Sequence, residues 1–260
     1  MTAASAWTVA AHPRLGKPVA RVAGSRDGTA APTPVRVVPD GLADLLVSAP
    51  IEAPTELVEL ALYGLKTRAR TVLSPTRVAN VSVRIRAAHV GALFGTDAAT
   101  LVDRAVPLRE LWGAAADRIA DDLARASDFG TRKAVLEHAL LDRVGALDDS
   151  GAQLAEAAAR AIEDRHGLVR IAELAQQLEC GERRLLRTFR RHVGLSPKAY
   201  AGVVRFQSAW GDLARGDSQA GVATRRGYSD QAHLLREFRR FSGAPPSAVG
   251  FVQSPAASLG

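Results

Sequence analysis

Residues 185–197 read LLRTFRRHVGLSP, and the same phrase returns at residues 234–246 as LLREFRRFSGAPP. Eight of the thirteen positions are identical, without a gap, at an offset of 49 residues. Internal repetition of this kind indicates that one supersecondary unit has been used twice. The repeated phrase therefore decides how the C-terminal part of the chain folds.

Each copy of the phrase predicts a helix. Leu and Phe four residues apart, as Leu185 and Phe189 are in the first copy, share one face of such a helix. The glycine that follows ends the helix, and the proline beyond it blocks continuation. A shorter helix is predicted before each copy, over residues 171–178 and about 220–226. The sequence thus predicts a helix, a tight polar turn and an arginine-bearing helix, twice.

Residues 227–240, GYSDQAHLLREFRR, resemble the signature of the AraC/XylS transcriptional regulators. Leu195-Ser196-Pro197, followed by Tyr200 and Arg205, is similar to the central segment of that family. The resemblance covers roughly the last third of the chain. It implies an all-α DNA-binding domain with two helix-turn-helix units, bridged by a long helix over about residues 197–215. In such units the second helix lies in the major groove, where residues near its N-terminus read base edges.

A small antiparallel sheet is predicted over residues 35–86. Residues 81–86 alternate strictly between apolar and polar, which is typical of a half-buried strand. Residues 38–45, 83–86 and 106–112 resemble the cupin-like β-barrel domain found in one branch of the AraC-type regulators. The segment is short for a closed barrel, so an open or reduced sheet stays as an alternative.

Helices are predicted over residues 87–165. An apolar helical stripe runs from Leu108 to Leu123, and polar pairs at 127–128 and 149–150 can cap two further helices. A share of AraC-type proteins self-associates through helices at this position, so a homodimer is one of the assemblies that the resemblance leaves open.

Together these features predict an α+β chain, with a small N-terminal antiparallel, cupin-like β domain that carries helices, followed by an all-α C-terminal domain with two helix-turn-helix units. The expected divisions are a loop-rich segment at 1–34, a sensor or interaction domain at 35–165, the AraC-type DNA-binding domain at 166–250 and a tail at 251–260.

The charge distribution favours a phosphate-binding surface in the repeated region. The chain carries a net charge of +7. Residues 167–250 hold 14 Lys and Arg against 7 Asp and Glu, whereas the remaining residues hold 20 of each. All of the excess positive charge therefore lies in one region, as expected of a domain that binds nucleic acid.

The polar face of the two repeated helices supplies the candidate DNA-contacting residues. By similarity to the family, Arg183, Leu186 and Arg187 match positions that face the major groove. Arg pairs bidentately with guanine and Gln with adenine, and each such contact contributes roughly 1–3 kcal/mol of discrimination. An intradomain ion pair stays as the alternative for Arg187 and its repeat, Arg236. The matching residues of the second helix are Gln231, Ala232, Leu235 and Arg236, and phosphate contacts are expected from Arg190, Arg191, Arg239 and Arg240.

Other chemistry is weakly represented. One cysteine, Cys180, excludes a disulfide framework, and its place in the predicted turn favours a packing role. The six histidines are scattered without metal-ligand spacing, so we expect no metal site. No nucleophile elbow, phosphate loop or dinucleotide fingerprint is present, so we expect no enzyme and no cofactor. Without a signal peptide or an apolar run long enough to span a membrane, the expected location is cytoplasmic.

The sequence thus predicts a sequence-specific, DNA-binding transcriptional regulator whose partner is double-stranded DNA. RNA polymerase, a small-molecule effector and a second copy of the chain stay open as further partners. The sequence leaves two other functions as alternatives. One is a DNA-repair alkyltransferase with an AraC-like module, which would need a reactive cysteine, and the other is a ligand-binding or protein-interaction module.

Overall fold

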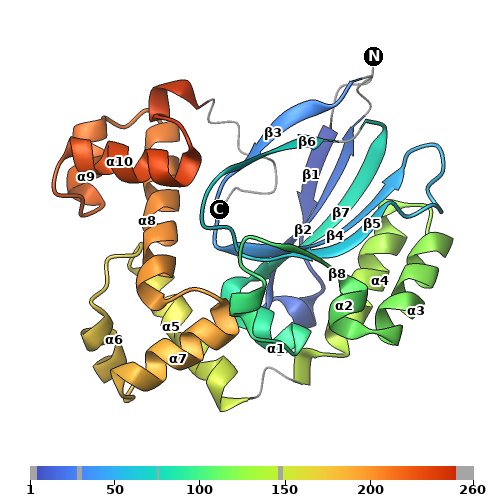
Figure 1. Cartoon of the computed structure of the whole chain (residues 1–260), viewed down its shortest axis with the longest axis horizontal. Helices are drawn as coiled ribbons and strands as arrows, with labels where there is room; N and C mark the ends of the chain where they lie inside the picture. Colours follow the sequence, from blue (N-terminus) through green and yellow to red (C-terminus); the bar gives the residue numbers. More distant parts are fainter. Residues whose placement is uncertain (1–4, 28–30, 75, 146–148, 250–260) are drawn as a thin grey trace.

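The chain folds into a β-rich N-terminal half and a helical C-terminal half, which lie side by side (Figure 1). The computed structural model describes residues 5–27, 31–74, 76–145 and 149–249. An antiparallel β region with helices is followed by helices, so the predicted fold class is confirmed.

Six strands of the N-terminal half form one antiparallel sheet, in the order β1-β2-β7-β4-β5-β8. β7 is central, where Val83 lies opposite Val22 of β2 and Leu45 of β4. β1 and β8 lie at the two ends, so the described strands form an open sheet rather than a closed barrel. The other two strands, β3 and β6, pair in a separate antiparallel ribbon. The strands are β1 (Ser5–Val9), β2 (Val19–Asp27), β3 (Thr33–Val37), β4 (Leu42–Pro50), β5 (Glu59–Tyr63), β6 (Arg70–Ser74), β7 (Val78–Arg86) and β8 (Ala105–Pro107).

Two strands lie where the sequence suggested loops. The prediction of a loop-rich segment over residues 1–34 is wrong for β1 and β2. A Cβ atom on Gly24 of β2 would lie 2.5 Å from the Trp7 ring and 2.7 Å from the Phe129 ring, so packing over the sheet requires this small residue. β2 pairs with β7, which is distant in the sequence. Such tertiary pairing overrides a composition that favours turns.

Five α-helices precede residue 165, and the last of them, α5, packs mainly against helices of the C-terminal half. Asp128 caps α4 as expected, because its Oδ1 accepts a hydrogen bond from the Thr131 amide at 3.0 Å. Asp149 caps α5 in the same way, with acceptor distances of 3.0 and 3.1 Å. These helices are α1 (Val90–Phe94), α2 (Leu108–Trp112), α3 (Ala114–Arg125), α4 (Phe129–Leu141) and α5 (Ser150–Asp164).

The helical stripe predicted from Leu108 to Leu123 is broken. Gly113 adopts φ +53° between α2 and α3, a left-handed conformation that glycine tolerates and that interrupts the helix. Leu108 and Leu123 are fully buried within the chain. The apolar stripe considered for self-association is therefore used for packing inside one copy.

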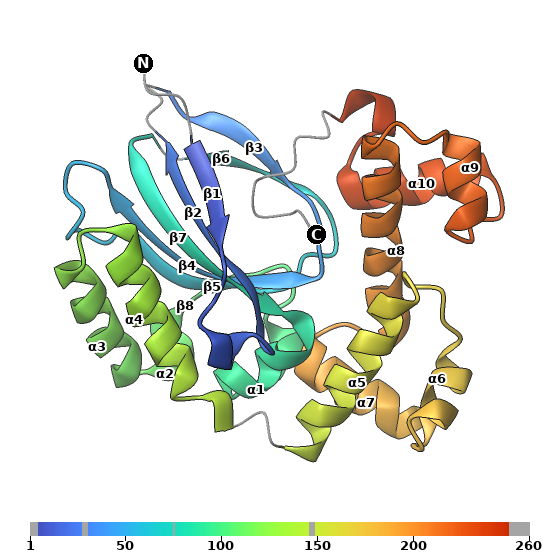
Figure 2. The same cartoon turned by 180° about the vertical axis from the view of Figure 1, so that it is seen from behind.

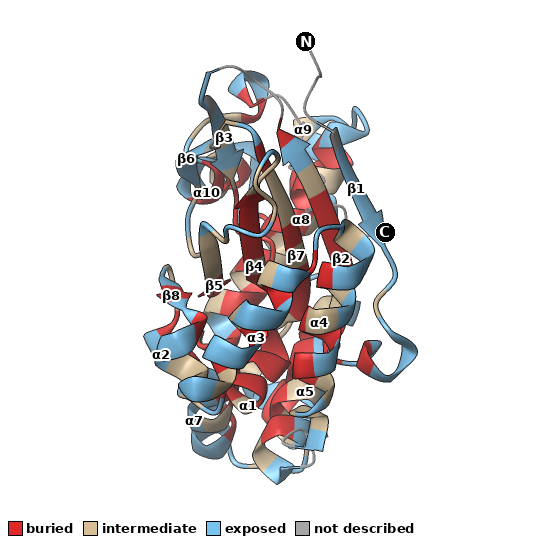
Figure 3. Cartoon of the chain, turned by 90° about the vertical axis from the view of Figure 1, so that its right-hand side faces the viewer, coloured by how far each residue is buried: buried red, intermediate tan, exposed pale blue. Residues whose placement is uncertain are grey.

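The strand predicted at residues 81–86 lies within β7. Its apolar residues are buried on the face that α4 covers (Figure 3). Arg84, on the opposite face, is only 2% exposed because it forms ion pairs with Asp40 and, at 2.6 Å, with Asp44. A charge is buried at tolerable cost only with such partners. β7 is therefore buried on both faces at this point, not on one as predicted.

The C-terminal half is arranged around one long helix, α8. Figures 1 and 2 show α6 and α7 at one end of α8, and α9 and α10 at the other. None of the helices in the described part of the chain has the length and apolar character needed to cross a bilayer. The helices of this half are α6 (Ile171–Gln177), α7 (Glu182–Val193), α8 (Pro197–Ala214), α9 (Gln219–Arg225) and α10 (Gln231–Ser242).

Candidate nucleic-acid interface

The two repeated phrases form α7 and α10, the second helices of two similar units. In α7, Leu185 and Phe189 are fully buried, and Gly194 ends the helix at φ +92°. In α10, Leu234 is buried in the same way, and Gly243 ends the helix at φ +75°. The helix boundaries and the core faces predicted from the repeated phrase are therefore found in both copies.

The turns that precede α7 and α10 have different residue types at the position with a positive φ. Gly227 adopts φ +67° in the second turn, and Glu179 adopts φ +49° at the matching point of the first. In both turns the next amide closes back on the first helix, from Cys180 to the Ala175 carbonyl at 3.0 Å and from Tyr228 to the Ala223 carbonyl at 2.9 Å. The first unit keeps its turn geometry with a non-glycine residue, at the cost of local backbone strain.

The candidate DNA-contacting side chains lie on the outer faces of α7 and α10. All are exposed except Leu235, which is partly buried. Arg187 and Arg236 form no ion pair with any described residue, so the alternative of an intradomain ion pair is not found for them. The exposed residues are Arg183, Leu186, Arg187, Arg190, Arg191, Gln231, Ala232, Arg236, Arg239 and Arg240.

Two of these side chains already have partners within the domain. Gln231 Nε2 donates to Gln219 Oε1 at 2.7 Å, which links the first turns of α9 and α10. Arg240 lies 3.4 Å from Glu237 and stacks over the Phe241 ring at 4.8 Å. Both contacts are at the surface, so a DNA contact could replace either of them at small cost.

α8 holds the two units at a fixed separation. Ser196 caps it by accepting a hydrogen bond from the Ala199 amide at 3.2 Å. Its 18 residues correspond to a length of about 27 Å. Near its start, Tyr200 packs on Phe189 of α7 with ring centroids 5.7 Å apart. Farther along, Phe206 packs on the aromatic residues of α10.

The N-terminal half contacts the C-terminal ends of α7 and α10. Gly91 of α1 and Gly194 after α7 allow close approach, since a Cβ atom at either would lie within 2.8 Å of a backbone oxygen across the contact. At α10, the Ala69 amide donates to the Phe241 carbonyl at 2.7 Å. Arg36 of β3 donates to the Ser242 carbonyl at 3.3 Å. The N-terminal turns of both helices, where base-reading residues are expected, lie away from these contacts.

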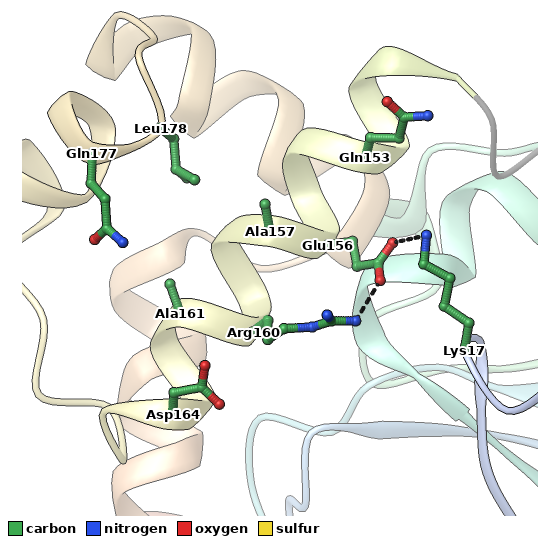
Figure 4. Close-up of a pocket in the computed structure, with 9 residues that line it drawn as sticks. All are labelled: Lys17, Gln153, Glu156, Ala157, Arg160, Ala161, Asp164, Gln177 and Leu178. Atoms are coloured by element: carbon green, nitrogen blue, oxygen red, sulfur yellow. Dashed lines mark hydrogen bonds and ion pairs between the residues drawn. The ribbon is translucent and has the colours of Figure 1, made fainter.

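Two surface cavities lie outside the helix-turn-helix faces. One, of about 440 Å³, lies along α5 and α6, where Lys17 and Arg160 both bind Glu156 at 2.8 Å (Figure 4). The other, of about 360 Å³, lies between the N-terminal half and α8. No group of three metal-ligating side chains occurs in the described ranges.

Sequence reasoning missed Asp212 and the ion pairs that join α8 to the second unit, and it named Arg205 only as part of the family resemblance. Asp212 of α8 is buried and binds Arg226 and two further arginines, and Arg205 of α8 binds Glu237 of α10 at 2.7 Å. A carboxylate within an otherwise apolar stretch of a helix, at residues 209–213, is the signal that could have revealed Asp212.

Comparison with known proteins finds a family profile that matches the C-terminal region. A family profile described as "Helix-turn-helix domain" matches residues 174–250. Structures of ToxT from Vibrio cholerae are distantly similar over most of the chain. An apo variant is 12% identical, with 94% of each chain covered and a TM-score of 0.39. The form bound to unsaturated fatty acid is 10% identical, with coverage of 98% of this chain and 96% of that chain and a TM-score of 0.38.

No curated protein matches the chain in sequence. The profile match begins within α6 and extends past α10, so it spans both repeated units that the structure reveals. It includes the signature residues 227–240 and the segment around Tyr200 and Arg205. Residues 174–250 of this chain therefore carry a helix-turn-helix domain, and the residues that resemble the AraC/XylS signature lie within it.

Proposed function

We propose that this protein is a sequence-specific transcriptional regulator of the AraC type, in which α7 and α10 read successive major-groove segments of one duplex. The observation that carries the proposal is the exposure of both arginine faces, on which Arg240 is the one candidate arginine with a carboxylate partner among the described residues, Glu237. Excess positive charge of this kind attracts phosphate.

The distance between the two units agrees with binding to two successive major-groove segments. α8 is about 27 Å long at 1.5 Å per residue, and the two reading helices lie at its opposite ends (Figure 2). Successive major-groove segments on one side of a duplex lie roughly 34 Å apart. One polypeptide would then contact two half-sites, as simpler repressors do as dimers.

Substitutions in the two reading helices test the division between base reading and phosphate contact. Arg183→Ala and Gln231→Ala are each expected to cost roughly 1–3 kcal/mol at one base pair and to relax the preference there. Arg239→Ala is expected to weaken binding to every duplex equally and to lower the salt slope by about 1. The measurement is selection of duplexes from a random pool, followed by titrations at several salt concentrations.

Arg109→Ala is the matched control, since Arg109 is an exposed arginine of α2 in the N-terminal half. It should leave affinity and preference unchanged. An equal loss on every duplex for Arg183→Ala, Gln231→Ala and Arg239→Ala would contradict the assignment of base-reading residues.

A small polar molecule is the further partner that we propose, bound in the cavity of about 360 Å³ beside α8. Cavities of roughly 300–1,000 Å³ suit small ligands. Charged residues from both halves line this one, among them Asp40 and Arg86 from the β-rich half and Arg215 and Arg226 from the helical half. A ligand that contacts both halves would change how the N-terminal half holds the reading helices.

A thermal-shift panel of sugars, amino acids and nucleotides tests this binding. A ligand of the folded protein raises the melting temperature by mass action. Ser208→Trp places a large side chain in the cavity wall and should abolish the shift, whereas Ser247→Trp, at an exposed site, should keep it. A shift that persists in Ser208→Trp would place the ligand elsewhere.

A further inference from the structure

A buried carboxylate on the linking helix gathers three arginines beside the second helix-turn-helix unit. The side chain of Asp212, on α8, is 1% exposed. It accepts hydrogen bonds from Arg226 through Nε at 2.7 Å and through Nη2 at 2.8 Å, so that both carboxylate oxygens are used. Arg215 contributes Nη2 at 2.5 Å, and Arg225 contributes Nε at 3.3 Å.

These contacts join separate helices of the domain. Arg226 is the C-cap that follows α9, the first helix of the second unit, so its bond to Asp212 fixes the end of α9 to α8. Arg205 binds Glu237 at 2.7 Å and thereby joins α8 to α10. Both helices of the second unit are therefore held on α8 by a charged pair. No ion pair joins α6 or α7 to α8 within the described ranges.

The paired Arg–carboxylate contact has a property that the apolar contacts lack. Burial of aromatic rings between α8 and α10 is non-directional and holds the unit against α8. Two parallel hydrogen bonds between a guanidinium and a carboxylate fix an angle as well as a distance. Hydrogen bonds from Arg226 also lower the pKa of Asp212 and keep it ionised. The pair can therefore set the rotation of the second unit about α8.

We propose that Asp212 is a positioning residue, which through Arg226 fixes the orientation of the second helix-turn-helix unit and so determines the spacing of the two half-sites that this domain accepts. The inference rests on the proposed function, because spacing has meaning only when both reading helices bind one duplex. Asp212 need not contact DNA to act in this way.

The test is binding to a series of duplexes in which the spacer between the half-sites is lengthened or shortened by one base pair. Wild-type protein is expected to prefer one spacing. The Asp212→Asn variant keeps the shape of the side chain and removes its charge. Its affinity for the duplex with the preferred spacing is expected to be about tenfold lower than that of wild type, because Asp212 and the orientation of the second unit are coupled. It should then bind all spacings about equally, with footprint protection retained at the half-site of α7.

Asp217→Asn is the matched control, because Asp217 also binds Arg225 but lies outside α8 at the surface. It should keep the wild-type spacing preference. If Asp212→Asn does not fold, Arg226→Lys replaces it, since lysine keeps the charge but cannot form the two parallel bonds.

The outcomes separate the two proposals. A wild-type footprint that covers a single half-site would overturn the proposed function. A two-part wild-type footprint, with the spacing preference of Asp212→Asn or Arg226→Lys unchanged, would overturn the positioning role alone. A uniform loss of affinity with the spacing preference intact would make Asp212 a structural residue only.

Discussion

Phe206→Ala is expected to lower the free energy of unfolding of the helical half by about 3–5 kcal/mol, as removal of a buried aromatic side chain does. Phe206 is fully buried in α8. Its ring centroid lies 5.7 Å from that of Trp210, 5.3 Å from that of Phe238 and 5.1 Å from that of Phe241. The cavity left by alanine would remove contacts on α8 and α10 together, and urea unfolding followed by tryptophan fluorescence measures the loss.

Val204→Ala provides the control on the same helix. Val204 is partly buried, so its truncation should cost about 1 kcal/mol, near the average for point substitutions. DNA binding by Phe206→Ala should fall with the folded fraction. Equal unfolding midpoints for the two variants would show that the aromatic cluster does not hold the second unit on α8.

The second large effect that we expect is on stability, since acidification should lower the free energy of unfolding through protonation of His89. This residue ends the short helical turn Ala87–His89 and is 2% exposed against α5. Burial lowers the pKa of His89 to about 4, and the positive charges of Lys17, Arg86 and Arg160 act in the same direction against the opposing effect of Glu156. Of these charged residues, Lys17, Glu156 and Arg160 line the cavity seen in Figure 4.

The sign of the pH dependence follows from which state binds the proton first. The unfolded chain protonates His89 near its ordinary value of about 6.5, whereas the folded chain does so only near pH 4. The free energy of unfolding therefore has its highest value above pH 6.5 and decreases as the pH falls toward 4. The difference between the two pKa values of His89 corresponds to a loss of about 3 kcal/mol in the free energy of unfolding.

Urea unfolding of wild type and His89→Leu between pH 7 and pH 4.5 measures this loss. Nδ1 of His89 has no hydrogen-bond partner in the described chain, so leucine gives up no bond at that atom. His89→Leu should lose less stability on acidification than wild type. His138→Leu, at an exposed site, should follow the wild-type curve. Parallel curves for wild type and His89→Leu would exclude His89 as the group responsible. His192, whose pKa burial also lowers, is expected to keep part of the dependence.

Much of the helical half was predictable from sequence because its determinants are local. Leu and Phe four residues apart, with a glycine after them, define α7 and α10 wherever the rest of the chain lies. Ser196 caps α8 through an amide three residues away, and Asp128 and Asp149 cap two helices of the N-terminal half in the same local way. Exposure of the arginine faces follows from the same spacing, since the apolar face of each helix must turn inward.

The β-rich half shows where local signals fail. The sequences of β1 and β2 contain many small residues, a composition that predicts loops. In the structure, β1 pairs with β2, and β2 pairs with β7. Arg84 reads as a solvent-facing residue of an alternating strand, yet it is buried. Its partners Asp40 and Asp44 lie about forty residues earlier in the chain, and no residue near Arg84 in the sequence indicates that it pairs with them.

The sequence by itself determined two helix-turn-helix units, the second helix of each and their positive charge, because helix periodicity, caps and composition act over a few residues. Only the tertiary structure decided how the units are held. The contacts of the N-terminal half with the ends of α7 and α10 join residues that are far apart in the chain. Asp212 and Arg226 are closer in sequence, but they pair only because α9 folds back against α8. The energy of such contacts depends on burial and distance, which no local pattern encodes.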